Sequence, residues 1–333
     1  MINVKIGLRA GGKKGRDMFT KENRTNVDVV ERDFVLFKNR VREVDETLVE
    51  TELVSEEYTP TLLDRSLNAD ELGRLFKLKP WGYSFRIDGS HTAYNIDTMK
   101  EAPAGQFTSE QPGGRDNRPA DFGLIEMDLR LSILRHIFKR YGPSSGESWL
   151  DIATNCGVIP LFVKRNSILN VTAIDLFSGN IDKAKYLAEL AGDTSSTFLV
   201  ADAYEYLRNR EDGSFDTVSA LGLFYHLSDP IGMLNLMYEK ARRMVIIDTI
   251  VHNFDFSGWI QTISRHLKYE HLAHANDTRK ILELHPTFRG LADALYQVGF
   301  DRVIHVVPSD ALLSKFPSQI YRDKNRAFVL AFK

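Results

Sequence analysis

The sequence predicts an α/β fold with a mostly parallel sheet and helices on both faces. From residue 147 to the end of the 333-residue chain, short apolar stretches typical of strands alternate with amphipathic stretches typical of helices. Strands that alternate with helices form parallel sheets whose two faces are both covered. Apolar residues make up 43% of the chain and charged residues 26%, which is average for a globular protein and sufficient for a buried core.

The expected elements follow one another in a regular order. An apolar run at 149–152 predicts the first strand, and a tight turn at 153–157 separates it from a helix over 158–166. Residues 251–286 interrupt the alternation and are predicted to be an inserted lid. The further strands are expected at 171–175, 198–200, 215–220, 244–250, 303–307 and 327–332, and the further helices at 180–191, 204–207, 231–241 and 287–298.

The first 121 residues lack this alternation and are predicted to form an N-terminal α+β extension, or cap. Residues 122–333 are predicted to form the α/β domain. Within the extension we expect β-type stretches between residues 27 and 54, helical turns from 62 to 78, and a flexible loop over 102–121, which is rich in Pro and Gly.

The charge balance and the cysteine content exclude several classes of protein. Lys and Arg number 43 against 45 Asp and Glu, so a net charge of −2 provides no general attraction to nucleic acid or to an anionic membrane. The basic residues of a helix expected over 124–141, Arg130 among them, are interpreted as a solvated face. The single cysteine, Cys156, excludes an intrachain disulfide and a multi-cysteine zinc site. Because the chain contains no apolar run of about 18 residues, we expect a cytoplasmic protein without a membrane segment.

The residues that end each strand are the candidate binding site, because ligands of an open α/β sheet bind beyond the carboxyl ends of the strands. Asp175 ends the second strand, about 20 residues beyond the first turn, which is typical of an acceptor for ribose hydroxyls. Its alternative role is that of a helix N-cap, which Ser178 can also provide. Asp202 follows the third strand and is interpreted as an acceptor for an adenine amino group, or as the cap of the next short helix.

This ordered set of strand ends resembles the class I methyltransferases that use S-adenosylmethionine, over residues 147–333. Their first loop usually reads Asp-x-Gly-x-Gly-x-Gly, and here Ala153 and Asn155 replace two of the glycines. Such a loop can still turn tightly against a sulfonium ligand, whereas a dinucleotide pyrophosphate needs a closer approach to the backbone. The resemblance implies a Rossmann-like, seven-stranded methyltransferase sheet with S-adenosylmethionine as cofactor. The cofactor-binding residues that it implies are Asp151, Ala153, Asn155, Gly157, Asp175, Leu176, Asp202, Ala203 and Leu221.

A narrower resemblance concerns residues 221–230, which read Leu-Gly-Leu-Phe-Tyr-His-Leu-Ser-Asp-Pro. This segment is similar to one in the tRNA wobble-uridine carboxymethyltransferase group, whose members use carboxy-S-adenosylmethionine. The resemblance implies that Tyr225 and Arg326 match two of the three side chains that hold the extra carboxylate. The third, a lysine after Pro-Trp, is absent, because the chain continues from Pro80-Trp81 with Gly82 and Tyr83. Ordinary S-adenosylmethionine is therefore the expected donor.

Tyr225 and His226 follow the fourth strand and are the candidate catalytic residues. The imidazole of His226 suits a general base near neutral pH, and the alternative is a packed and inert histidine. Tyr225 is expected to shape the site rather than to act as the base, because a free phenol has a pKa of about 10. With Tyr225, the candidate acceptor-binding residues are His91, Trp259 and Arg326.

Three functional hypotheses remain open. The leading one is an enzyme that methylates oxygen, nitrogen or carbon of a small-molecule acceptor in specialised metabolism. The second is an enzyme that modifies a tRNA anticodon base, which requires a continuous basic groove. The third is a non-catalytic methyltransferase-like module. Glu270, His271 and His274 have spacing that a metal site can use, but we interpret them as solvent-facing residues of the lid and predict no metal. The oligomeric state is left open.

Overall fold

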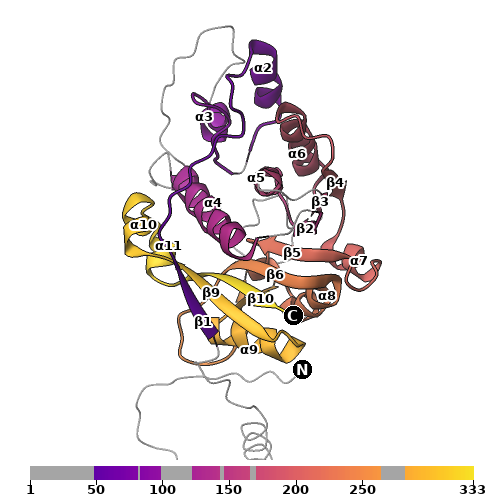
Figure 1. Ribbon diagram of the computed structural model, residues 1–333, viewed down its shortest axis with the longest axis vertical. Coiled ribbons are helices and arrows are strands. Elements are labelled where there is room, and N and C mark those ends of the chain that lie inside the picture. Colours follow the sequence, from indigo (N-terminus) through magenta and orange to yellow (C-terminus); the bar gives the residue numbers. More distant parts are fainter. Residues whose placement is uncertain (1–48, 82, 99–121, 143–145, 166–169, 264–281) are drawn as a thin grey trace, which may run out of the picture. The chain divides into compact units, whose positions relative to one another are not determined.

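An eight-stranded, mostly parallel sheet forms the centre of the structure (Figure 1). The computed structural model describes residues 49–81, 83–98, 122–142, 146–165, 170–263 and 282–333, and Thr47–Lys333 group as one compact unit. Strand β10 runs antiparallel to both of its neighbours, and all other neighbouring strands are parallel. The order is β1 (Val49–Val54), β9 (Arg302–Pro308), β10 (Arg326–Phe332), β6 (Ala241–Ile250), β5 (Phe215–Leu221), β2 (Ser148–Ile152), β3 (Asn170–Asp175) and β4 (Thr197–Val200).

The predicted fold class is confirmed, and the sheet has one strand more than the seven expected. The additional strand, β1, comes from the N-terminal extension and pairs with β9 along its whole length, from Val49 opposite Val303 to Val54 opposite Pro308. The extension therefore contributes directly to the sheet. Its composition predicted a β-type stretch, but not a partner near the other end of the chain.

Helices cover both faces of the sheet because successive strand residues are buried on opposite sides. Trp149 of β2 belongs to one core cluster and Leu150 to the other, and Ile246 and Ile247 of β6 divide in the same way. The first cluster includes side chains of α4 (Phe122–Tyr141), α5 (Val158–Lys164) and α6 (Ser178–Leu190), and the second includes side chains of α8 (Pro230–Lys240) and α9 (Phe288–Val298).

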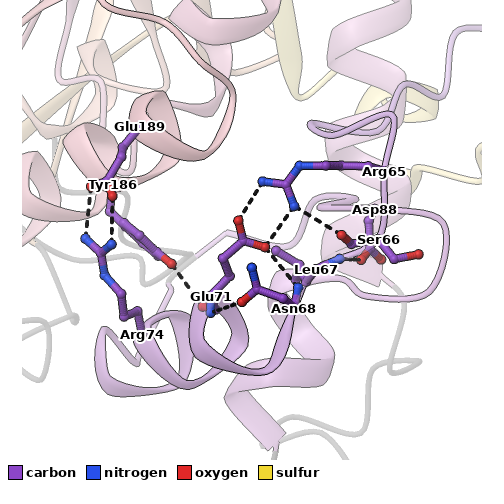
Figure 2. A network of polar contacts seen from close by, with 9 residues as sticks. All are labelled: Arg65, Ser66, Leu67, Asn68, Glu71, Arg74, Asp88, Tyr186 and Glu189. Atoms are coloured by element: carbon purple, nitrogen blue, oxygen red, sulfur yellow. Dashed lines mark hydrogen bonds and ion pairs between the residues drawn. The ribbon is translucent and has the colours of Figure 1, made fainter.

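Helix α2 (Ala69–Lys77) of the extension packs against α6. Arg74 makes two hydrogen bonds to Glu189 at 2.7 and 2.9 Å, and the Tyr186 hydroxyl donates to the carbonyl oxygen of Glu71 at 3.0 Å (Figure 2). The helix begins later than the apolar stripe indicated, because Asn68 and Glu71 form a capping box that satisfies the first amide groups.

The insertion at 251–286 contains two strands that the sequence pattern did not reveal. β7 (Trp259–Ile263) and β8 (Leu282–Pro286) pair antiparallel, with Trp259 opposite Pro286. The residues between them, including Glu270, His271 and His274, lie outside the described residues, as does the loop predicted at 102–121. The remaining helices are α3 (Ala93–Thr98), α7 (Ala203–Arg208), α10 (Asp310–Lys315) and α11 (Gln319–Arg322). Among the described helices, none has the length and apolar character needed to cross a bilayer.

Candidate active site

The carboxyl ends of β2, β3 and β4 lie together at one edge of the sheet. The strands run parallel, with Asp151 opposite Ala173 and Asp175 opposite Val200. The loop after β2 is joined to β3 by a hydrogen bond from the Thr154 amide to the carbonyl oxygen of Ile174, at 2.9 Å. The expected strand-end residues are therefore brought to a common edge.

The loop after β2 takes the left-handed conformation at three positions. The φ angles are 58° at Ala153, 53° at Asn155 and 74° at Gly157. Asn155 relieves part of this strain, because its side-chain oxygen accepts from the Cys156 amide at 2.7 Å. Gly157 is needed for another reason: a Cβ there would lie 2.5 Å from the Cβ of Ala184 on α6. The turn therefore forms with alanine and asparagine where the family usually has glycine.

Asp175 lies at the centre of this edge and is only 6% exposed. Its carboxylate accepts from the Asn155 amide at 2.8 Å and from the Phe177 amide and the Asn180 side chain, both at 3.0 Å. A carboxylate has about four acceptor positions, so these three described donors leave one, on Oδ2. Helix α6 begins at Ser178 after an N-cap at Phe177, so Asp175 precedes the formal cap.

Two exposed apolar side chains flank Asp175. Leu176 is 52% exposed and Val200, opposite Asp175 on β4, is 54% exposed. Val200 was not among the predicted site residues, although its position at the end of a strand was visible in the sequence. Together the two side chains offer an apolar surface beside a carboxylate.

The other predicted cofactor residues have mainly structural contacts. Asp151 is buried and accepts from the Ser219 hydroxyl at 2.6 Å, and burial raises the pKa of its carboxyl to about 6. Asp202 is exposed and accepts from the Glu205 amide at 2.9 Å, so it caps α7 as its alternative interpretation held. Ala203 is the first residue of α7, and Leu221 is buried in the first core cluster.

Tyr225 and His226 lie in a short 3-10 turn, η2 (Phe224–His226), directly after β5, and their ring centroids are 4.1 Å apart. Nδ1 of His226 lies 3.0 Å from Oε1 of Glu283, a buried residue of β8. Glu283 was missed because it is far from His226 in the sequence and reaches it only through the contact of β8 with η2. The imidazole and a carboxylate thus form a pair at the end of β5.

Arg326 belongs to a buried ionic cluster. It makes two hydrogen bonds to Asp248, at 2.7 and 2.8 Å, and Arg130 of α4 forms a second ion pair with Asp248 at 3.0 Å. Burial disfavours charge on all three groups, but their attraction holds the pKa of Asp248 below its usual range and the pKa values of both arginines above theirs. The interpretation of Arg130 as solvated is wrong: it is 6% exposed, because α4 turns it toward Asp248.

Three polar groups of this region converge on Gly222, which has a φ of 92°. A Cβ at Gly222 would lie 3.6 Å from Nη2 of Arg326, 3.6 Å from the Tyr83 hydroxyl and 3.7 Å from the Tyr225 hydroxyl. Tyr83 was not predicted as a site residue, although it follows the Pro-Trp pair. Tyr225 and Arg326, which were predicted together, are therefore brought together here.

His91 and Trp259 are placed differently. His91 contacts Asp88 within its own turn, with Nδ1 3.0 Å from both carboxylate oxygens. Trp259 begins β7 and packs against the second core cluster. Their described contacts are structural, and their role in binding an acceptor stays a prediction.

Residues 150–247 match the family model described as a methyltransferase domain. This part of the chain is similar to a methyltransferase domain, and the match bears out the predicted enzyme class. The match is to the broad domain, so the resemblance to the wobble-uridine group stays a prediction. Among curated proteins, no sequence matches the chain.

Solved structures share the fold at low sequence identity. The N-terminal domain of EvdMO1 in the presence of SAH and D-fucose has a TM-score of 0.50 at 15% identity, over 80% of this chain and 96% of that one. Its SAH-bound form has a TM-score of 0.49 with the same identity and coverage. An S-adenosylmethionine dependent methyltransferase from Mesorhizobium loti has a TM-score of 0.45 at 18% identity, over 63% of this chain and 100% of that one. At these identities the likeness describes the fold alone.

Proposed function

We propose that the protein transfers a methyl group from S-adenosylmethionine to a small-molecule acceptor, at the edge where β2, β3 and β5 end. The methyl donor carries an electrophilic methyl on a sulfonium, and the protein has to hold that donor beside an aligned acceptor. The observation that carries the proposal is the arrangement around Asp175. A nearly buried carboxylate with one acceptor position left lies between the left-handed loop and the exposed side chains of Leu176 and Val200.

This arrangement fits the adenosyl part of the donor. The remaining position on Oδ2 of Asp175 suits one ribose hydroxyl. The apolar surface of Leu176 and Val200 suits the face of an adenine base. The turn at 153–157 lies beside this acceptor position, because the Asn155 amide donates to Oδ2 of Asp175. The SAH named for the EvdMO1 domain is consistent with a donor of this kind.

His226 is the group we assign to proton removal from the acceptor. With Nδ1 bonded to the Glu283 carboxylate, Nδ1 carries the hydrogen of the neutral ring and Nε2 carries the lone pair that accepts a proton. The same carboxylate stabilises the imidazolium that forms. Tyr225 lies between His226 and the Arg326 cluster and contributes to the wall of the acceptor site.

The proposal is tested by calorimetric titration of the full chain with S-adenosylmethionine and with S-adenosylhomocysteine. Asp175→Asn is expected to weaken both affinities at least about tenfold, or about 1.4 kcal/mol. The side-chain amide has one oxygen that accepts hydrogen bonds, whereas the carboxylate has two. Asp193→Asn is the matched control, because Asp193 also accepts backbone amides but lies in the turn after α6. Equal affinities for Asp175→Asn and the unaltered chain would contradict the proposal.

One observation favours a second candidate, transfer of a carboxymethyl group from carboxy-S-adenosylmethionine. Arg130 adds a cation to the Tyr225 and Arg326 region, where the sequence lacks the expected lysine. The two arginines exceed the single Asp248 by one positive charge, which favours an anionic group nearby. If the same titration shows carboxy-S-adenosylmethionine binding more tightly than S-adenosylmethionine, the carboxylated donor is the physiological one.

A further inference from the structure

Four aromatic rings form a continuous stack beside the candidate active site. We call His285, His252, Phe254 and Phe256 the aromatic ladder. The centroids are 5.5 Å apart for His285 and His252, 5.9 Å for His252 and Phe254, and 5.8 Å for Phe254 and Phe256. The interplanar angles are 22°, 15° and 16°, so neighbouring rings are stacked with an offset.

The inner end of the ladder, at His285, adjoins the proposed catalytic residues. The Tyr225 ring meets His285 edge to face, with centroids 6.1 Å apart and an interplanar angle of 81°. His285 also lies 3.5 Å from the Glu283 carboxylate that binds His226. The ladder therefore begins next to His226, the proposed general base, and extends toward solvent.

The outer end of the ladder faces solvent. Phe254 is 55% exposed and Phe256 is 50% exposed. Their backbone is nevertheless held in place, because the Thr287 hydroxyl donates to the carbonyl oxygen of Phe256 at 2.6 Å and the Thr287 amide donates to that of Gly258 at 2.9 Å. Gly258 lets the Phe256 ring lie against the chain, since a Cβ there would be 2.7 Å from that ring. Two exposed phenyl faces are thus held in a fixed orientation, which is typical of a binding surface.

The inner rings also carry unsatisfied polar atoms. Nε2 of His252 and Nδ1 of His285 are buried and have no hydrogen-bond partner in the described part of the chain. Burial, and then the proximity of His285, lowers the pKa of His252, which favours the neutral form of its ring. A ligand hydroxyl can donate to or accept from such nitrogens, whereas a hydrocarbon leaves them unpaired.

We propose that the aromatic ladder binds the methyl acceptor and that the acceptor is a planar aromatic molecule bearing a hydroxyl group. Its ring packs on the exposed part of Phe254, and its hydroxyl pairs with Nε2 of His252, the adjacent ring of the ladder. This inference rests on the proposed function, of which it names the substrate class.

The test uses two probes of similar size, planar 2-naphthol and saturated decahydro-2-naphthol, each titrated into the full chain saturated with S-adenosylhomocysteine. Phe254→Leu keeps an apolar side chain and removes the ring. We expect 2-naphthol to bind the unaltered chain more tightly than its saturated analogue, and Phe254→Leu to weaken 2-naphthol about fivefold while changing the analogue less than about twofold. Leu53→Ala, on the edge strand β1, is the control for loss of another exposed apolar side chain and is expected to change neither.

Three results would overturn the inference: no binding of 2-naphthol, equal weakening of both probes by Phe254→Leu, or a dimer of the chain that this variant dissociates in sedimentation. The last result would make the ladder an interface between two copies. Failure of the proposed function is separate, because it shows as absent binding of S-adenosylhomocysteine itself. Melting curves of the variants check that each is folded.

Discussion

Glu283 and His226 illustrate how a single contact can set the chemistry of a residue. His226 was visible in the sequence as a candidate base, but the sequence left open whether it is packed and inert. The carboxylate at 3.0 Å decides which ring nitrogen carries the hydrogen. Asp175 differs from this pair, because its position at the end of a predicted strand was sufficient to make it a candidate binding residue.

At this scale we predict that Glu283→Ala changes the tautomer of His226. In the unaltered chain the neutral ring should carry its hydrogen on Nδ1, and in the variant the population should move toward the Nε2-bonded form, since the acceptor at Nδ1 is gone. Nitrogen-15 NMR of the imidazole distinguishes the two forms. His305 of β9, whose ring lies tilted against Phe288 and has no described contact with Glu283, is the internal control. An unchanged His226 spectrum would mean that Glu283 does not position the ring.

Among the elements, the junction of β2 with α5 shows how packing restricts sequence. Gly157 begins α5 from a left-handed conformation and also lies against α6, where Ala184 is its neighbour. Ala153 and Asn155 also adopt the left-handed conformation. At position 157, however, any side chain would in addition collide with Ala184. Glycine is therefore required at position 157, whereas the two earlier positions of the turn tolerate a side chain.

We expect Gly157→Ala to destabilise the fold by about 2–4 kcal/mol. The new methyl would meet Ala184 Cβ at 2.5 Å and force α5 and α6 apart, in addition to the left-handed strain. Gly192→Ala is the control, because Gly192 has a φ of 70° but no atom within 4 Å of the new methyl. It should cost about 1 kcal/mol. Urea unfolding of both variants measures the difference, and similar losses would argue against the steric explanation.

The strands of the main sheet after residue 147, and the helices between them as far as α9, were predictable because each has its own apolar period and its own turn. The short helices α10 and α11, between the last two strands, were not predicted. The hairpin of β7 and β8 was not predictable, since a run rich in histidine and aromatic residues has no clear alternation. The burial of Arg130 was not predictable either. The helix around it is rich in basic residues, and its partner Asp248 is distant in the sequence. Of the site, the strand-end acid was predictable, whereas contacts between distant segments such as Tyr83 and Gly222 were not.

Across the whole molecule, Asp248 joins parts that are far apart in the chain. Its carboxylate binds Arg130 of α4, Arg326 of β10 and the hydroxyl of Tyr321 on α11, the last at 3.2 Å. Because Asp248 is fully buried, water cannot compensate its charge, and among the described residues these neighbours do so.

Asp248→Asn is expected to lower the free energy of unfolding by about 3–5 kcal/mol, because two buried guanidinium groups lose their counter-charge. Glu189→Gln is the control: it removes an exposed bidentate partner of Arg74, and water replaces that interaction. Thermal and urea unfolding compare the two. A loss no larger than that of the control would show that the guanidinium groups find other compensation.

The pairing of β1 with β9 has a practical consequence for anyone who shortens this protein. A chain trimmed to begin after Val54 would still contain the whole segment that matches the methyltransferase model, yet β9 would become the outermost strand. The backbone amides and carbonyls of β9 would then be open to pairing with another molecule. The side chains of this strand are largely buried in the untrimmed chain. A truncated version of this kind invites aggregation, so expression trials should retain the first strand.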